Sequence, residues 1–294
     1  MANTHKFGGS WTQEKLDRVG AYLEAYTTIF HANERAQYFT TYYVDAFAGT
    51  GHRQDSNAST GLQEIEDNDS QANEFLEGSV SIALNAKPGF DRFLFIERSP
   101  KRFRELDQLV RNHPKANRIS VLQGDANERL LEWRRSIDWK KTRAVVFLDP
   151  YGMQVNWETI AELGATQGID LWLLFPIGMA VMRLLTRKRL PPPEWEAALT
   201  RIFGDDEWKN RFYVQNPQIS MFEDETENFV RDANWQKVAD YLVERLKTVF
   251  PAVHRKPYPL FNSQKIPLYL LCFAASNEKG APTALKIANH LLQH

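Results

Sequence analysis

Residues 142–152, TRAVVFLDPYG, join an uninterrupted apolar run to an abrupt polar end. The run AVVFL is typical of a strand that is covered on both faces, as strands of parallel sheets are. Asp149, Pro150 and Gly152 are residues that turns favour, but a turn does not require Tyr151. The stretch therefore predicts a buried strand, and the tyrosine at its carboxyl end needs a further explanation.

Similar apolar runs recur along the chain and alternate with segments of helical periodicity. This alternation predicts a parallel sheet with helices on both faces. Two late strands have no helix between them and should pair antiparallel. The expected strands are 42–47, 91–99, 117–126, 142–150, 169–175, 254–260 and 267–275. The expected helices are 12–37, 79–86, 100–112, 128–135, 156–164 and 282–293.

The predicted fold class is a doubly wound α/β fold. It contains a mostly parallel seven-stranded sheet, an antiparallel strand near the C-terminus and a helical insertion after the fifth strand. A chain of 294 residues is long enough to bury a full core. We expect an N-terminal helical segment at 1–40, a sheet domain at 41–182 and 251–294, and the insertion at 183–250. The acidic segment 53–77 reads as a surface loop.

The formal net charge of -1 gives no overall attraction to nucleic acid. Any such partner must be held by a local basic patch, for which a solvated helix face is the alternative. The candidate patch lies on a helix expected to end at the prolines 191–193 and consists of Arg183, Arg187, Lys188 and Arg189.

Cys272 is the single cysteine, so a disulfide within the chain is excluded. It lies in an apolar run, which indicates a buried thiol.

The most hydrophobic stretch, residues 169–185, is interrupted by polar residues, proline and glycine. It fits a strand followed by a helix better than a membrane span. The N-terminus lacks the apolar core of a signal peptide, so we expect a soluble cytoplasmic protein. Of the seven histidines, only His290 and His294 have an i, i+4 spacing, and two such residues alone do not make a metal site, so none is expected.

Carboxylates follow four of the expected strands. Ligands of doubly wound sheets bind beyond the carboxyl ends of the strands. Each acid alone could cap a helix, but four at consecutive strand ends favour a bound ligand. The residues are Asp45 with the glycines Gly49 and Gly51, Glu97, Asp125 and Asp149.

A nucleoside cofactor explains these carboxylates economically. Glu97 can accept hydrogen bonds from ribose hydroxyls, and Asp125 can accept one from an adenine amino group. A dinucleotide requires a G-x-G-x-x-G turn that leads directly into a helix, which is missing here. S-adenosylmethionine has no pyrophosphate, and Asp45 suits its ammonium group. The residues therefore favour S-adenosylmethionine over a dinucleotide, and a nucleotide-dependent oxidoreductase is the less favoured class.

Four motifs resemble those of class I S-adenosylmethionine-dependent methyltransferases: YVDAFAGTG, FIERS, LQGDANE and FLDPYG. The wider order also resembles the three-Cys-motif partner proteins, over about residues 12 to 290. That order includes Lys15 with Tyr22, GSVSIAL, LLFPIG and LYLLCFAAS. The resemblance implies a methyltransferase-like protein that works beside a separate protein with three cysteines.

The resemblance also implies the residues that hold the cofactor. The lone Cys272 agrees with a partner that supplies the cysteines. The implied cofactor-binding residues are Lys15, Asp45, Phe47, Gly49, Gly51, Glu97, Arg98, Asp125, Ala126 and Asp149.

The DPYG motif is similar to the Asp/Asn-Pro-Pro-Tyr motif of enzymes that methylate exocyclic amines. The catalytic roles would fall to Asp149 and the Pro150 carbonyl, which accept the amine hydrogens, and to Tyr151, which stacks on the acceptor. Only one proline is present, and Gly152 follows the tyrosine. A structural turn whose tyrosine packs on the cofactor or the core is the alternative.

The predicted function is N-methylation of a nucleic-acid base or a nucleotide-like acceptor. The alternative is a non-catalytic module that binds S-adenosylmethionine or S-adenosylhomocysteine and serves a three-cysteine partner.

Overall fold

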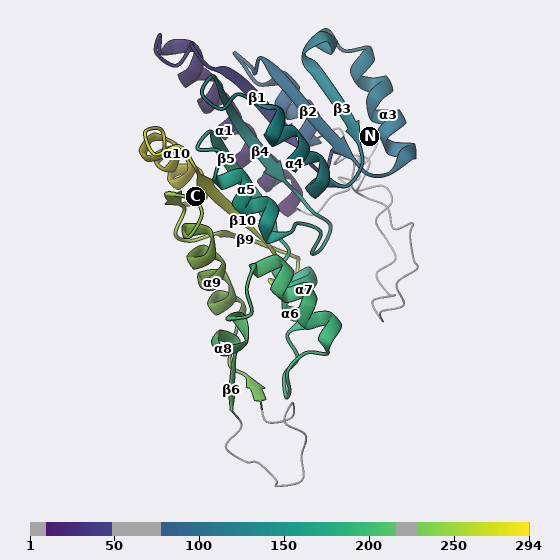
Figure 1. Ribbon diagram of the computed structural model, residues 1–294, viewed down its shortest axis with the longest axis vertical. Helices are drawn as coiled ribbons and strands as arrows, with labels where there is room; N and C mark the ends of the chain where they lie inside the picture. The colour runs from purple at the N-terminus through teal and green to yellow at the C-terminus, as the bar shows by residue number, and fades with distance from the viewer. Residues whose placement is uncertain (1–9, 49–77, 216–228, 294) are drawn as a thin grey trace, which may run out of the picture.

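The structure, a computed structural model, describes residues 10–48, 78–215 and 229–293 and has a mixed α/β architecture (Figure 1). In the described residues the central sheet has eight strands in the order β3-β2-β1-β4-β5-β10-β8, and β9 pairs with β10. The strands are β1 (Thr40–Asp45), β2 (Arg92–Glu97), β3 (Ile119–Gln123), β4 (Thr142–Leu148), β5 (Ile169–Phe175), β8 (Ala252–Val253), β9 (Tyr258–Phe261) and β10 (Pro267–Ala275).

The predicted fold class is confirmed: β1 to β5 are parallel, and the C-terminal strands are antiparallel. The expected count of seven strands was wrong, because β8 adds an eighth. It contains only two residues and forms its ladder with the far end of β10, so no local pattern marks it. The late pair β9 and β10 is antiparallel as predicted.

Helices cover both faces of the sheet and account for the apolar runs of its strands. One core contains Val44 and Val146 with residues of α4 (Ala126–Ser136) and α5 (Trp157–Gly164). The other contains Tyr43 and Val145 with residues of α1 (Ser10–Ala32), the helix at 78–85, α3 (Pro100–Arg111) and α10 (Ala281–Gln293). Neighbouring strand residues thus face opposite cores, which explains why these strands are apolar throughout.

The first helix is shorter than expected. We predicted that it would reach residue 37, but α1 ends at Ala32, and residues 34–38 form turns. The segment ANERAQ offers exposed polar side chains rather than an apolar face, so packing on the sheet cannot extend the helix.

The winding of the chain reverses beside β1. From β1 the chain proceeds to β2 and β3 on one side, and then returns to β4 and β5 on the other. The register pairs Val44 with Leu94 on one neighbour and with Val146 on the other. Such a switch point opens a crevice between the carboxyl ends of the two central strands. Asp45 ends β1 and Asp149 directly follows β4, so both acids lie at this crevice.

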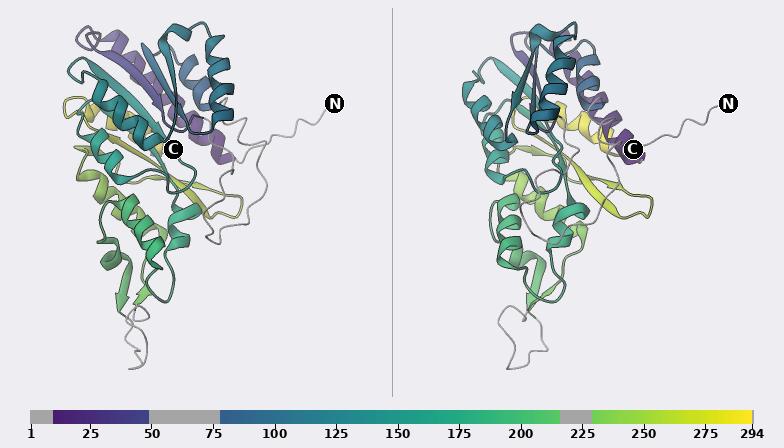
Figure 2. Two further views of the ribbon diagram at one scale, coloured as in Figure 1. Left: turned by 45° about the vertical axis from the view of Figure 1, so that its right-hand side comes forward. Right: turned by 90° about the vertical axis from the view of Figure 1, so that its right-hand side faces the viewer.

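A mostly helical segment extends from one end of the sheet (Figures 1 and 2). It begins at η2 (Ile177–Val181). Gly178 lets the backbone of this element lie close to that of Pro267, because a Cβ at residue 178 would lie 1.9 Å from the Pro267 carbonyl oxygen. The pair β6 and β7 was not predicted, and the predicted domain boundaries stay a prediction. The remaining elements are α6 (Met182–Leu184), α7 (Pro193–Phe203), α8 (Trp208–Phe212), β6 (Tyr213–Gln215), β7 (Phe229–Arg231) and α9 (Trp235–Lys247).

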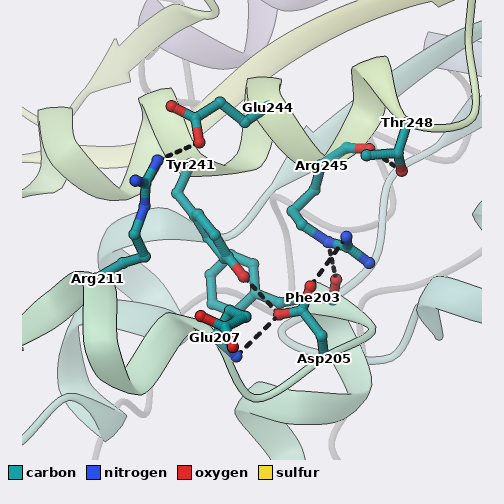
Figure 3. Close-up of polar contacts among 8 residues, drawn as sticks. All are labelled: Phe203, Asp205, Glu207, Arg211, Tyr241, Glu244, Arg245 and Thr248. Carbon is teal, nitrogen blue, oxygen red and sulfur yellow. Dashed lines mark hydrogen bonds and ion pairs between the residues drawn. The ribbon is translucent and has the colours of Figure 1, made fainter.

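Polar contacts join the helices of this segment to one another (Figure 3). Asp205 accepts a hydrogen bond from the Tyr241 hydroxyl and pairs with Arg245 at 2.9 Å. Arg245 also donates through Nε to the Phe203 carbonyl oxygen at 2.8 Å, which caps the end of α7. The contacts fix α9 against the end of α7, while the buried side chains of both helices enter the same core as the sheet.

The predicted basic helix before the prolines was wrong. Helix α6 ends at Leu184, so only the first of the four basic residues is helical. Arg231 donates to the carbonyl oxygens of Met182 and Leu185 at 3.2 and 2.7 Å, and these bonds satisfy acceptors that a longer helix would have used. Arg183, Arg187, Lys188 and Arg189 are all exposed.

The hydrophobic stretch 169–185 forms β5 and the short helices after it, as predicted, and Cys272 is buried in β10. Within the described ranges, no helix combines the length and apolarity that a membrane crossing requires.

Candidate functional site

The predicted site residues meet at the carboxyl edge of the parallel strands. Asp45 ends β1, Glu97 ends β2, Asp125 precedes α4 and Asp149 follows β4. The ladder places β1 between β2 and β4, so residues far apart in the sequence become neighbours. Gly49, Gly51 and the segment 53–77 lie outside the described residues, and the roles that the sequence predicts for them stay predictions.

A pocket lies at this edge between β1, β2 and α4. Four predicted cofactor-binding residues line it: Phe47, Arg98, Asp125 and Ala126. Gln154 also lines the pocket, and sequence reasoning missed it. Its place could not be read from the chain, because it comes from the loop after β4, whose path depends on tertiary contacts.

Glu97 lies beside this pocket and is almost fully buried, with 3% of the residue exposed. Its Oε1 accepts a hydrogen bond from the Ser99 backbone N–H at 2.5 Å. Among the described residues, Oε2 is buried without a hydrogen-bond partner. Burial raises the pKa of this carboxyl, and the Ser99 N–H and the Arg102 charge oppose that effect. An open acceptor of this kind suits a ligand hydroxyl.

Asp125 caps α4. Its Oδ1 accepts from the backbone N–H groups of Asn127 at 2.9 Å and Glu128 at 3.4 Å. Asp125 is therefore a helix cap, as the alternative interpretation held, and it also lines the pocket. Asn127, which was not predicted, donates to the Gln154 carbonyl oxygen at 2.8 Å and accepts from Thr159 at 2.9 Å. It ties α4 to the loop after β4.

Asp45, Lys15 and Asp149 form a buried charged cluster. Lys15 Nζ lies 2.7 Å from Asp149 Oδ2, and their side chains are 1% and 9% exposed. Asp45 is fully buried, and its Oδ1 accepts from the Phe47 backbone N–H at 3.1 Å. Within the described ranges, Asp45 Oδ2 has no hydrogen-bond partner. Of the two carboxylates, Asp149 thus has a lysine partner, while one oxygen of Asp45 stays open.

Burial dominates the electrostatics of this cluster. It raises the pKa of Asp45 to about 7, and the nearby Asp149 charge acts in the same direction. Hydrogen bonds from Ser79 and Phe47 and the charge of Lys15 oppose the increase. Burial also lowers the pKa of Lys15, and the Asp149 and Asp45 charges oppose that change. A cationic ligand would relieve this imbalance by neutralising Asp45.

The DPYG turn exposes its tyrosine. Tyr151 is 53% exposed, and its backbone N–H donates to Gln154 Oε1 at 3.1 Å. Gly152 has a φ of 82°, a conformation that glycine adopts without strain. The glycine after the tyrosine is thus explained by the turn, and the Tyr151 ring stands outside the core.

An aromatic wall that sequence reasoning missed lies beside the charged cluster. Trp11 and Tyr269 stack with ring centroids 5.3 Å apart. Lys15 Nζ lies 5.5 Å from the Trp11 ring and 5.8 Å from the Phe147 ring. Burial raises the pKa of Tyr269 above its usual range, and the Asp149 charge adds to this effect. These rings come from α1, β10 and β4, so only the tertiary fold brings them together.

Comparisons with known proteins identify no family. No family model matches the chain, and no curated protein matches it either. The resemblance to three-Cys-motif partner proteins therefore stays a prediction.

Distant structural similarities include S-adenosylmethionine-dependent methyltransferases. A putative enzyme of this kind from Listeria monocytogenes has 11% identity and a TM-score of 0.36, over 87% of this chain and 98% of that one. Another from Mesorhizobium loti has 10% identity and a TM-score of 0.30, over 81% and 91%. A Legionella pneumophila protein of the DUF519 family has 13% identity and a TM-score of 0.40, over 98% and 91%. Scores this low carry no functional argument, which must come from the site.

Proposed function

We propose that this protein binds S-adenosylmethionine at the carboxyl edge of β1, β2 and β4 and transfers its methyl group to a nitrogen of a planar, nucleotide-like acceptor. One observation carries the proposal: two buried carboxylates beside one pocket, Asp45 and Glu97, each keep an oxygen without a partner among the described residues. Buried polar atoms are usually satisfied, so such atoms point to a ligand that supplies donors.

The donor side of the proposed site follows from the order of the strands. The cofactor's ribose hydroxyls donate to Glu97 at the end of β2, and its ammonium lies near Asp45 at the end of β1. The adenine occupies the pocket lined by Phe47, Arg98 and Ala126. This arrangement places the adenine ring, the ribose hydroxyls and the ammonium in the order in which they follow one another along the cofactor.

The acceptor side is proposed to lie at the end of β4. Asp149 and the Pro150 carbonyl accept hydrogens from the acceptor amine, and the exposed Tyr151 ring stacks on its plane. The exposed basic residues of the predicted patch are candidates for contacts with a phosphate backbone: Arg183, Arg187, Lys188 and Arg189.

The transfer itself is a displacement. The nitrogen lone pair forms the new N–C bond as the C–S bond breaks. The electron pair of the broken bond stays on sulfur and cancels the sulfonium charge, which leaves S-adenosylhomocysteine. The surplus N–H proton passes to water past the Asp149 carboxylate. The chain's own contribution is to orient the lone pair and keep the acceptor plane fixed.

The test is methyl transfer from labelled S-adenosylmethionine to DNA, RNA and protein, with cofactor affinity measured by calorimetry on the same samples. Asp149→Ala should abolish transfer and leave cofactor affinity nearly unchanged, because this carboxylate serves the acceptor. Asp149→Asn should keep part of the activity, since an amide oxygen still accepts a hydrogen bond. Cofactor binding without transfer to any pool would instead indicate a non-catalytic module for a three-cysteine partner. Absence of cofactor binding would end the proposal.

A further inference from the structure

Lys15 is an unusual residue for the place it occupies. It is the one charged side chain among the largest fully buried side chains of the described residues, and the others are aromatic. Its helix, α1, lies outside the strand–helix units that build the parallel sheet. Its ammonium nevertheless reaches Asp149, which lies 134 residues further along the chain.

The attachment of α1 does not explain this lysine. Val19, Tyr22 and Leu23 of the same helix are buried in the core beneath it. The Tyr22 hydroxyl also donates to Asp170 Oδ2 at 2.6 Å, at the opposite edge of the sheet. Burial of an ammonium is costly, and a buried ion pair is often replaced by apolar residues without loss of stability. A lysine at this buried position therefore points to a role in the site.

The ion pair gives the two oxygens of the Asp149 carboxylate different environments. Oδ2 is held by Lys15 at 2.7 Å, so this oxygen is already committed to the protein. The same ammonium lies 5.5 Å from the centre of the Trp11 ring and 5.8 Å from that of the Phe147 ring, and these contacts limit how far it can move. Fixing one oxygen leaves Oδ1 for an acceptor hydrogen and restricts the carboxylate to one orientation.

We propose that Lys15 is a positioning residue for the methyl acceptor: it fixes Asp149 through Oδ2 and keeps that group a carboxylate, so that Oδ1 accepts a hydrogen from the acceptor amine. The inference rests on the proposed function, because it assigns a partner to the residue that orients the acceptor. A protonated Asp149 would keep one uncharged accepting oxygen, as Asp149→Asn does, and would hold the acceptor amine more weakly than the carboxylate.

The groups around Asp149 support a need for the lysine. Asp45 and Tyr43 face it from β1, Tyr269 faces it from β10, and Tyr151 lies in its own turn. These groups are acidic or neutral, so none of them favours the ionised carboxylate through charge. Burial raises the pKa of Asp149, and the charge and hydrogen bond of Lys15 oppose that increase. Removing the lysine charge therefore favours protonation of Asp149.

The first measurement is the pH profile of kcat for methyl transfer in three variants. Lys15→Met should lower kcat at pH 7 by about 100-fold, and activity should return as the pH rises. Lys15→Arg, which keeps the charge, should retain the wild-type profile. The matched control is Tyr22→Phe, which removes a buried polar contact of the same helix at the opposite edge. It should lower stability and leave the profile in place. Equal losses at every pH in Lys15→Met would overturn the proposal.

The second measurement does not require activity. Carbon-13 spectra of aspartate-labelled protein, assigned with Asp149→Asn, follow the titration of Asp149 directly. The titration should move to higher pH in Lys15→Met and stay in place in Tyr22→Phe; an unmoved titration would overturn the role of Lys15. If Lys15→Met fails to fold, Lys15→Gln replaces it in both measurements. A wild-type protein that binds no S-adenosylmethionine would refute the proposed function, whatever the outcome of this titration.

Discussion

Acidic residues lie at both ends of the central strands, at the amino edge and at the carboxyl edge of the sheet, but their hydrogen bonding differs. At the amino edge, Asp91 Oδ2 accepts from the Thr41 backbone N–H and hydroxyl, each at 2.8 Å. Asp170 accepts from Tyr22 at the same edge. At the carboxyl edge, Asp45 and Glu97 each keep a buried oxygen without a partner among the described residues.

The difference separates the acids of the amino edge from Asp45 and Glu97. A buried acceptor that is satisfied within the protein holds elements together. A buried acceptor that stays open destabilises the unliganded protein and can be satisfied by a ligand. Substitutions at the two edges should therefore have opposite consequences: loss of stability at the amino edge, and loss of ligand affinity at the carboxyl edge.

The largest expected effect is a pH-dependent stability difference at Asp45. Its pKa in the folded protein is about 7, against an ordinary value of 3.8 for an aspartate side chain. The folded state therefore keeps a proton that the unfolded state releases, and stability falls as the pH rises from about 4 to about 7. A difference of about 3 pH units corresponds to about 4 kcal/mol, an upper limit for this group. Asp45→Asn should remove this dependence.

Urea unfolding at pH 5 and pH 8 measures the effect. The difference between the two pH values should be smaller in Asp45→Asn than in the wild type. Asp170, whose pKa burial raises to about 6, contributes with the same sign at the amino edge. Saturating S-adenosylmethionine should reduce the contribution of Asp45 to the pH dependence of stability and leave that of Asp170 unchanged, because only Asp45 gains a cationic partner. An equal pH dependence in Asp45→Asn and the wild type would contradict the comparison.

The second-largest effect is expected at Glu97, where ligand affinity tests the comparison between the two edges. Glu97→Ala should weaken binding of S-adenosylmethionine by about 1.5–3 kcal/mol, the range for hydrogen bonds to a charged group. Without ligand, Glu97→Ala should be as stable as the wild type or more stable, because the substitution removes a buried carboxylate oxygen that has no partner. Calorimetry and thermal unfolding on one preparation measure both. Tyr22→Phe is the reciprocal control and should lose stability at unchanged affinity. Unchanged affinity in Glu97→Ala would move the pocket elsewhere.

The smallest effect is expected at Tyr151, whose side chain stands in solvent. Tyr151→Phe keeps the ring and should change methyl transfer only slightly. Tyr151→Ala removes the stacking surface and should weaken acceptor binding by about 1–3 kcal/mol. Neither variant should change the unfolding temperature appreciably, because the residue is 53% exposed. Steady-state kinetics over a range of acceptor concentrations separates the two variants, and equal behaviour of both would argue against stacking.

Much of the fold could be predicted because its signals are local. Apolar runs such as AVVFL identify the central strands, and Pro100 marks the start of α3 as expected. The errors arose where the outcome depends on distant contacts. The two-residue β8 exists through its ladder with β10, and α6 ends where Arg231 takes up its carbonyl oxygens. No pattern within either segment reports such a contact.

The sequence by itself determined which carboxylates end the strands, because strand ends and turns are encoded by neighbouring residues. Only the tertiary structure decided what each carboxylate does. Asp125 caps its helix, Asp149 pairs with Lys15, and Asp45 keeps an open oxygen. The Asp125 cap is local, but the difference between Asp149 and Asp45 depends on which distant side chain reaches each acid and on how completely water is excluded. The desolvation of these two acids is a property of the assembled core, and the contact of Lys15 with Asp149 forms only when α1 packs on the sheet.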